Sequence, residues 1–283
     1  MLDIALSTFK EIYRKKIFHF IAILTILYLS LLTFIIYNVG KEMAQVGSLV
    51  NMITNISSII SFLGFYFSSM LVAFLTVMLS IGMVSSELES GTVLTILTKP
   101  IKRSEYILGK YIGTSMLIII YSAILYIAVI IISTVSKISI VDTFGVLVLA
   151  KGFIFFILEP LTLLALILYG STKFKTLNNG IFIIAIYILG IISTVIEQIG
   201  SLTKNDTLTT LGIISSFISP FDAIYKKMVS TIFASLGSFN FVMGFGMQGG
   251  STTPSLWMMV YVCVYLVFFI FLSVRGFEKK DIG

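Results

Sequence analysis

The sequence predicts an all-α polytopic membrane protein: six transmembrane helices, an amphipathic interface helix before the first, and a short cytoplasmic helix between the second and third. Hydrophobic residues make up 58% of the 283 residues. Charged residues make up only 11%, far below the roughly 25% typical of soluble domains. Apolar runs longer than the ~18 residues that indicate a membrane helix recur along the chain. We therefore expect a single transmembrane domain over residues 1–283.

The rarest residues exclude several classes of active site. Cys263 is the only cysteine, so neither a disulfide framework nor a cysteine-based metal site is possible within one chain. His19 is the only histidine, which argues against histidine metal sites and Ser/His dyads. No Gly-x-x-x-x-Gly-Lys-Ser/Thr phosphate loop is present. We expect no catalytic residues, no metal and no bound cofactor, and any ATP that drives the protein is bound on another polypeptide.

Residues 1–16, before the first apolar run, predict an amphipathic helix on the inner membrane surface. Apolar residues recur there at steps of three and four, as expected for one face of a helix: Leu2, Leu6, Phe9 and Tyr13. Two interpretations of this helix are open. It is either a plain lipid-facing anchor or a helix that also contacts a partner.

Six apolar runs predict the membrane crossings, and each can span a ~30 Å hydrocarbon core at 1.5 Å per residue. The first run exceeds the ~7 to 15 residue core of a cleavable signal peptide. With the N-terminus inside, 13 of the 19 basic residues fall in cytoplasmic segments, which predicts a plasma-membrane protein with both termini cytoplasmic. The same clustering of basic residues beside apolar runs argues against nucleic-acid binding. The runs are 17–39, 58–84, 107–134, 144–169, 180–199 and 255–275.

Residues 200–254 are semi-apolar and contain Pro220 and the glycine-dense run GSFNFVMGFGMQGG. Non-helical backbone at membrane depth is tolerated only where protein or a water-filled cavity covers it. We therefore expect an external or re-entrant segment that caps the bundle. A further full crossing would invert the basic C-terminal end, so it is the less favoured alternative.

The loop over residues 85–106 gathers unusual charge in an apolar chain, within SSELESGTVLTILTKPIKRSEYILGK. Ser85 or Ser86 can cap a short helix with two glutamates in its first turn. Gly91 permits a sharp turn, after which Thr92 can cap a second short helix that is mostly apolar. Isolated helices this short need further contacts to be stable. The pattern predicts a docking surface, and an ordinary solvated loop is the alternative.

The same loop resembles the cytoplasmic signature of ABC-2 type transporter permeases. The resemblance is closest to the branch that serves multi-copper enzyme and nitrous oxide reductase maturation. It is carried by Glu87-x-Glu89-x-Gly91-Thr92, Leu94, Lys99-Pro100, Arg103 and Leu108-Gly109-Lys110, and by a charged tail after Arg275.

The resemblance implies a permease subunit without enzymatic activity, acting as an exporter. It implies two cytoplasmic ATPase subunits that bind ATP and Mg, and a second permease copy or a related permease. It makes residues 85–106 a cytoplasmic coupling loop that carries a coupling helix. The residues it assigns to the ATPase contact are Glu87, Glu89, Gly91, Thr92, Leu94, Pro100 and Arg103. Two alternatives stay open: a secondary carrier that uses Glu159 and Glu197, or a structural or sensory protein that recruits another cytoplasmic partner.

Glu159 lies within the fourth apolar run, immediately before Pro160. An acidic residue near the bilayer middle costs ~2.5 kcal/mol or more on insertion scales. Glu159 is therefore either a point on the substrate path or dimer seam, or a protonated or hydrogen-bonded structural residue. Gly109 and Gly113 form a Gly-x-x-x-Gly pair that allows close helix packing. No particular substrate is predicted.

Overall fold

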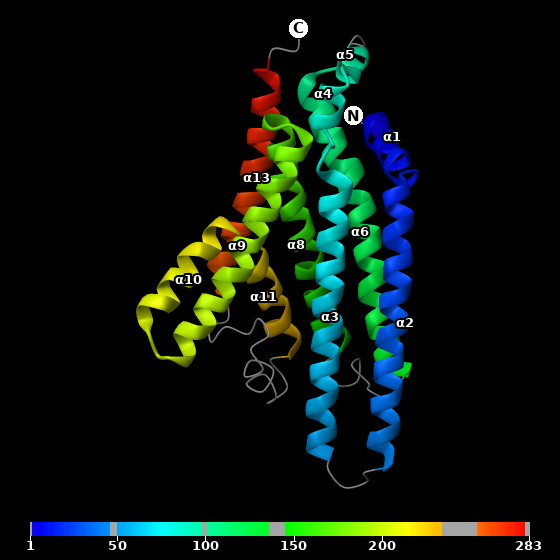
Figure 1. Cartoon of the computed structure of the whole chain (residues 1–283), viewed down its shortest axis with the longest axis vertical. Coiled ribbons are helices and arrows are strands. Elements are labelled where there is room, and N and C mark those ends of the chain that lie inside the picture. The colour runs from blue at the N-terminus through cyan, green and yellow to red at the C-terminus, as the bar shows by residue number, and fades with distance from the viewer. Residues whose placement is uncertain (1, 46–49, 98–100, 136–144, 234–253, 281–283) are drawn as a thin grey trace.

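A computed structural model describes residues 2–45, 50–97, 101–135, 145–233 and 254–280, and every regular element in these ranges is a helix. Figure 1 shows an elongated bundle. The helices are α1 (Leu2–Tyr13), α2 (Lys16–Gln45), α3 (Val50–Ser80), α4 (Ser85–Glu89), α5 (Thr92–Leu97), α6 (Arg103–Val135), α8 (Val146–Lys173), α9 (Thr176–Leu202), α10 (Asp206–Ile218), α11 (Phe221–Phe233) and α13 (Leu256–Glu278).

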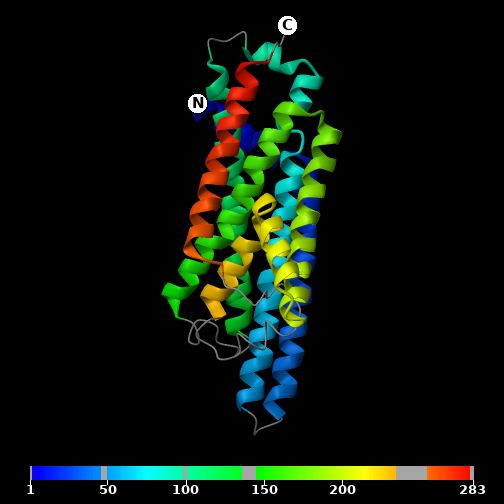
Figure 2. The same ribbon diagram turned by 90° about the vertical axis from the view of Figure 1, so that its left-hand side faces the viewer.

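Among the described residues, six helical segments are long and apolar enough to cross a membrane, which confirms the predicted all-α fold with six candidate spans. They are α2, α3 continued through α4, α6, α8, α9 and α13. The bent pair of α10 and α11 would add a seventh if the two helices were counted as one span. Both chain termini lie at the same end of the bundle, together with α1, α4 and α5 (Figure 1 and Figure 2). We call this the termini end. The chain is a multi-pass membrane protein.

Helix α8 is the centre of the bundle. It contacts α3, α6, α9, α11 and α13, and 61% of its most apolar window is buried, compared with 22% for α2 and for α13. Leu163, Leu164 and Leu168 are fully buried on it. The outer helices instead expose apolar side chains such as Phe20 and Ile23, as a lipid-facing surface requires.

Helices α10 and α11 occupy part of the segment that was expected to be external or re-entrant. Asn205 caps α10 by accepting hydrogen bonds from the backbone N–H groups of Thr207 and Leu208. Helix α10 then packs back on α9, where Ser193 Oγ donates to the Gly212 carbonyl at 2.6 Å. At Ser219 and Pro220 the axis bends by 107°, and α11 runs into the bundle beside α8 (Figure 1).

Candidate functional site

The α4–α5 elbow, residues 85–97, occupies the loop where the sequence predicts a docking surface. The expectation that Ser85 or Ser86 caps α4 is wrong, because no side chain caps it from within its own segment. Instead Ser171 Oγ, at the end of α8, accepts from the backbone N–H groups of Val84 and Ser85, each at 2.9 Å. The base of the elbow is therefore fastened to the end of α8.

Gly91 makes the turn between the two short helices. Its φ of +72° lies in the left-handed region that favours glycine, and no atom would contact a Cβ there. After the turn, Val93 is buried, whereas Leu94 is 52% exposed. Helix α5 lies beyond α4 at the extremity of the bundle (Figure 1). The elbow thus presents an apolar side chain outward from a fixed base.

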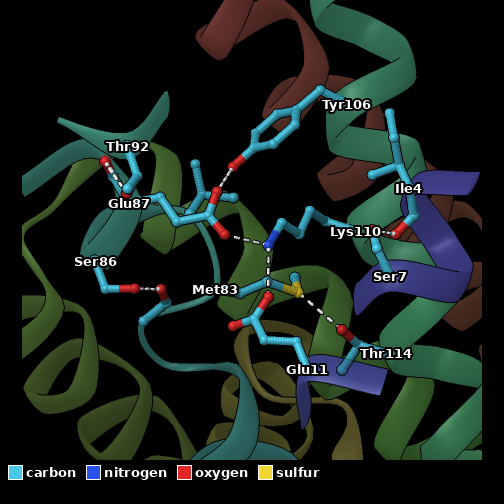
Figure 3. Close-up of polar contacts among 12 residues, drawn as sticks. Ile4, Ser7, Glu11, Met83, Ser86, Glu87, Thr92, Tyr106, Lys110 and Thr114 are labelled. Carbon is cyan, nitrogen blue, oxygen red and sulfur yellow. Dashed lines mark hydrogen bonds and ion pairs between the residues drawn. The ribbon is translucent and has the colours of Figure 1, made fainter. Parts of the chain in front are cut away.

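The side chain of Glu87 points into the bundle rather than into solvent (Figure 3). Its carboxylate accepts hydrogen bonds from Lys110 Nζ and from the Tyr106 hydroxyl, both on α6. Lys110 Nζ also lies 3.4 Å from Glu11 Oε2 on α1. This cluster, which we call the Lys110 cluster, links α4, α6 and α1 through one ammonium group.

Burial makes this pairing necessary. The Lys110 side chain is only 6% exposed and Glu87 is 16% exposed, so either charge alone would be costly. Glu11 is half exposed. Burial by itself would raise the pKa of Glu11, but the charges of Lys110 and Lys15, and their hydrogen bonds to it, outweigh that effect and lower the pKa. Glu11 therefore stays ionised beside the lysines.

Glu89 contacts the opposite side of the elbow. Its Oε1 accepts from the backbone N–H of Thr176, the first residue of α9, at 2.6 Å. A carboxylate is favourable at this positive end of a helix. Glu89 also lines a cavity of about 530 Å³, which is bordered by Lys173, Lys175 and Lys280. The groove beside the elbow is therefore rich in basic groups.

Arg103 holds the C-terminal end of α13 against the start of α6. Its Nη1 donates to the carbonyls of Glu278 at 3.0 Å and Lys280 at 2.9 Å. Lys280 Nζ in turn donates to the Thr172 carbonyl at 3.0 Å. The Arg103 guanidinium thus binds carbonyl groups of its own chain. Pro100 lies outside the described residues.

The glycine pair on α6 lies beside α1. Both Gly109 and Gly113 are buried, and a Cβ on Gly113 would sit 2.4 Å from the Ala5 carbonyl oxygen. Ala5 and Ile12 are buried, whereas Leu6 and Tyr13 are more than half exposed. Helix α1 therefore packs the face that carries Ala5 on α6 and turns part of its apolar stripe outward.

Comparison with known families agrees with this architecture. The model of the ABC-2 family transporter protein matches residues 2–282. The chain belongs to the ABC-2 transporter family. No curated protein matches it. Members of this family are transmembrane transporter components, generally not catalytic themselves, and the family implies association with an ABC ATPase. The branch expected from the sequence stays a prediction.

In the ABC-2 permease, Glu159 on α8 is buried and accepts a hydrogen bond from Ser69 Oγ on α3 at 2.6 Å. It lines a cavity of about 10 Å³ with three tyrosines and Asp222, a space of roughly one water molecule. Tyr66, Tyr187 and Tyr225 are the tyrosines. Glu159 is a hydrogen-bonded residue that faces a small polar space between helices.

Sequence analysis missed a second charged group inside the ABC-2 permease. Lys226 Nζ on α11 pairs with Glu197 Oε2 on α9 at 2.6 Å, and both side chains are 6% exposed. Asp222 lies one turn before Lys226 on the same helix. Lys226 is one of the six basic residues that were not assigned to a cytoplasmic segment, and neither it nor Asp222 was considered as a site residue. The four-residue spacing of an acid and a base in an apolar helix was the available signal.

Proposed function

We propose that this ABC-2 permease exports its substrate across the plasma membrane with energy from two separate cytoplasmic ABC ATPase subunits, and that the α4–α5 elbow couples it to them. In this proposal the termini end faces the cytoplasm, and two permeases, either identical or related, form the transport unit. The observation that carries the proposal is the outward tip of the elbow, where Leu94 is half exposed above a base held by side chains from other helices.

The contacts of the elbow support a route for coupling. A displacement of α5 would pass through α4 directly into α3. It would reach α6 and α1 through the Lys110 cluster, and α9 through the bond from Thr176 to Glu89. Coupling requires that the docked elbow interact differently with the ATPase before and after ATP binding. A rigidly connected elbow would turn that difference into helix movement.

The resemblance assigns all of these residues to one ATPase-binding surface, whereas their contacts favour two different roles. Glu87 and Arg103 would position the elbow and the C-terminal tail from inside the chain. Leu94 and Thr92, both exposed, would contact the ATPase. The lysines of the groove beside Glu89 would border that contact.

The test is purification of the tagged chain from its native membrane in mild detergent, followed by mass spectrometry and an ATPase assay. We expect a near-stoichiometric ATPase with the wild-type chain and loss of most of it with Leu94→Ser. Leu211→Ser is the matched control, since Leu94 and Leu211 are 52% and 50% exposed but lie on α5 and α10. A wild-type chain that recovers no nucleotide-hydrolysing partner would favour the carrier or recruitment alternatives.

A further inference from the structure

A cavity of about 330 Å³ opens between α9, α10, α11 and the first turns of α13. It lies away from the elbow, on the side of the bundle where α10 leans outward (Figure 1). We call it the α10–α13 cavity. Its charged lining residues are Glu197, Asp222 and Lys226, and its aromatic ones are Phe217, Trp257 and Tyr261. Its volume falls within the ~300 to 1,000 Å³ of small-molecule sites.

The charges of the α10–α13 cavity favour a cationic ligand. The single lysine faces two carboxylates, because Lys226 pairs with Glu197 and also interacts with Asp222. The three lining groups therefore carry one more negative than positive charge when all are ionised. Lys227 lies outside the lining, and its Nζ donates to the carbonyl of Pro254 at 2.8 Å. An anion entering the cavity would meet this excess of negative charge at close range. A cation would be attracted by it.

The aromatic wall favours the same kind of ligand. Tyr261 donates a hydrogen bond to the Phe217 carbonyl at 2.7 Å, and the two rings lie 5.2 Å apart in an edge-to-face arrangement. The bond holds the Tyr261 ring in place before any ligand arrives. Ring faces attract ammonium-type cations, most strongly where water is excluded. Carboxylates and aromatic rings together are how proteins recognise organic cations.

The rim of the α10–α13 cavity indicates how a ligand would enter. Trp257 is 81% exposed and Phe217 is 45% exposed, on helices that belong to a membrane bundle. Tryptophan at the start of a spanning helix is typical of the membrane–water interface. A ligand that passes this rim would contact an exposed aromatic surface, which favours one with an apolar part. An inorganic cation, which needs a shell of oxygen ligands, does not fit this mostly apolar lining.

We propose that the α10–α13 cavity binds an amphipathic organic cation, with its charged head beside Asp222 and its apolar body against Phe217, Trp257 and Tyr261. Binding is a property of the permease alone. That the bound cation is also the exported substrate rests on the function proposed above. Because Asp222 also lines the small cavity of Glu159, the two polar spaces share one side chain.

The experiment measures binding to the purified full-length permease in nanodiscs of neutral lipid, without any ATPase. The probe is a dimethylaminostyryl N-methylpyridinium dye, followed by fluorescence anisotropy. Its uncharged parent pyridine, at mildly alkaline pH, has nearly the same shape and serves as the charge control. We expect the cation to bind about tenfold tighter than the neutral parent, the difference that one favourable charge contact supplies.

Three variants test the location. Asp222→Asn should weaken binding of the cation about tenfold, and Trp257→Ala should weaken it several-fold. Asp206→Asn makes the same chemical change on an exposed residue of α10 and should bind as the wild type does. Because Asp222→Asn could impair folding, its size-exclusion profile is compared with that of the wild type. If Asp222→Asn is misfolded, Trp257→Ala decides the result, because Trp257 lies at the exposed rim.

Equal binding of the charged and uncharged dyes to the wild type would overturn the proposal. Unchanged binding of the cation in both cavity variants would also overturn it. Failure of the proposed function is distinguishable, because Leu94→Ser should lose the ATPase and still bind the dye. If the dye binds at this cavity but never stimulates hydrolysis in the assembled complex, the site stands and the dye is not a transported substrate.

Discussion

Glu87 and Lys110 form an ion pair that lies inside the bundle, between α4 and α6, and the Lys110 ammonium is shared with Glu11 of α1. This ion pair accounts for part of the charge that is gathered at the loop of an apolar chain. It fastens the short helices, which could not be stable alone, to the longer ones.

Glu87→Gln should destabilise the protein, because among the described residues it leaves the buried Lys110 ammonium with the longer contact to Glu11 as its ion pair. Breaking a buried pair costs about 3 to 5 kcal/mol, and we expect about 2 kcal/mol here because Glu11 still compensates part of the charge. Thermal unfolding in detergent measures the change. The double variant Glu87→Gln/Lys110→Met should recover most of the loss.

The matched control for this pair is Lys15→Met, which removes a more exposed contact to the same Glu11. Exposed pairs of this spacing contribute about 0.3 to 0.5 kcal/mol, so its unfolding temperature should hardly change. A Glu87→Gln protein that unfolds at the wild-type temperature would show that the Lys110 cluster is not structural.

Gly91→Ala should reduce assembly with the ATPase by more than its loss of stability alone would. The φ values of Gly91 and Gly145 are +72° and +77°, and a Cβ on either would meet no atom within 4 Å. Alanine should therefore cost ~1 to 2 kcal/mol of backbone strain at Gly91 and about 1 to 3 kcal/mol at Gly145, whose ψ of 149° lies in a region that almost only glycine adopts. Only Gly91 lies in the elbow, so only Gly91→Ala should reduce ATPase recovery. Equal recovery from both variants would argue against the elbow as the coupling element.

Gly113→Ala should displace α1 from α6, since the new Cβ would collide with the Ala5 backbone rather than with a flexible side chain. We expect a loss of about 1 to 3 kcal/mol, the usual cost of overpacking. Gly180→Ala is the control, because its nearest contact is the Ile81 side chain at 3.3 Å. Limited proteolysis after Lys10 should become faster in Gly113→Ala alone. Unchanged protection would mean that α1 does not depend on this close approach.

Lys226→Met should be more damaging than any of these changes, because it leaves the Glu197 carboxylate buried without its ammonium partner. The expected loss of stability is about 3 to 5 kcal/mol. The double variant Glu197→Gln/Lys226→Met should recover most of the lost stability, and thermal unfolding measures the recovery. A double variant no more stable than Lys226→Met would show that Asp222, rather than Glu197, sets the requirement for this lysine.

The six spans, the short helices and the turn at Gly91 were predictable from the sequence, because each depends on residues close together in the chain. Hydropathy over a window indicates a membrane helix, and a glycine between two short helical patterns indicates a turn. The amphipathic pattern of residues 1–16 was visible for the same reason.

The partners of the charged side chains were decided by tertiary structure alone. Glu11 and Lys110 are far apart in the sequence, as are Ser171 and the α4 amides that it caps, and local patterns do not specify which faces of two helices meet. The loop glutamates were therefore expected at a docking surface, whereas Glu87 pairs inside the bundle and Glu89 binds the start of α9. Asp222 and Lys226 escaped notice because their role depends on α11 turning back into the bundle after a 107° bend. A buried charge needs a partner wherever the fold places it, and only the packing of the helices determines which partner is within reach.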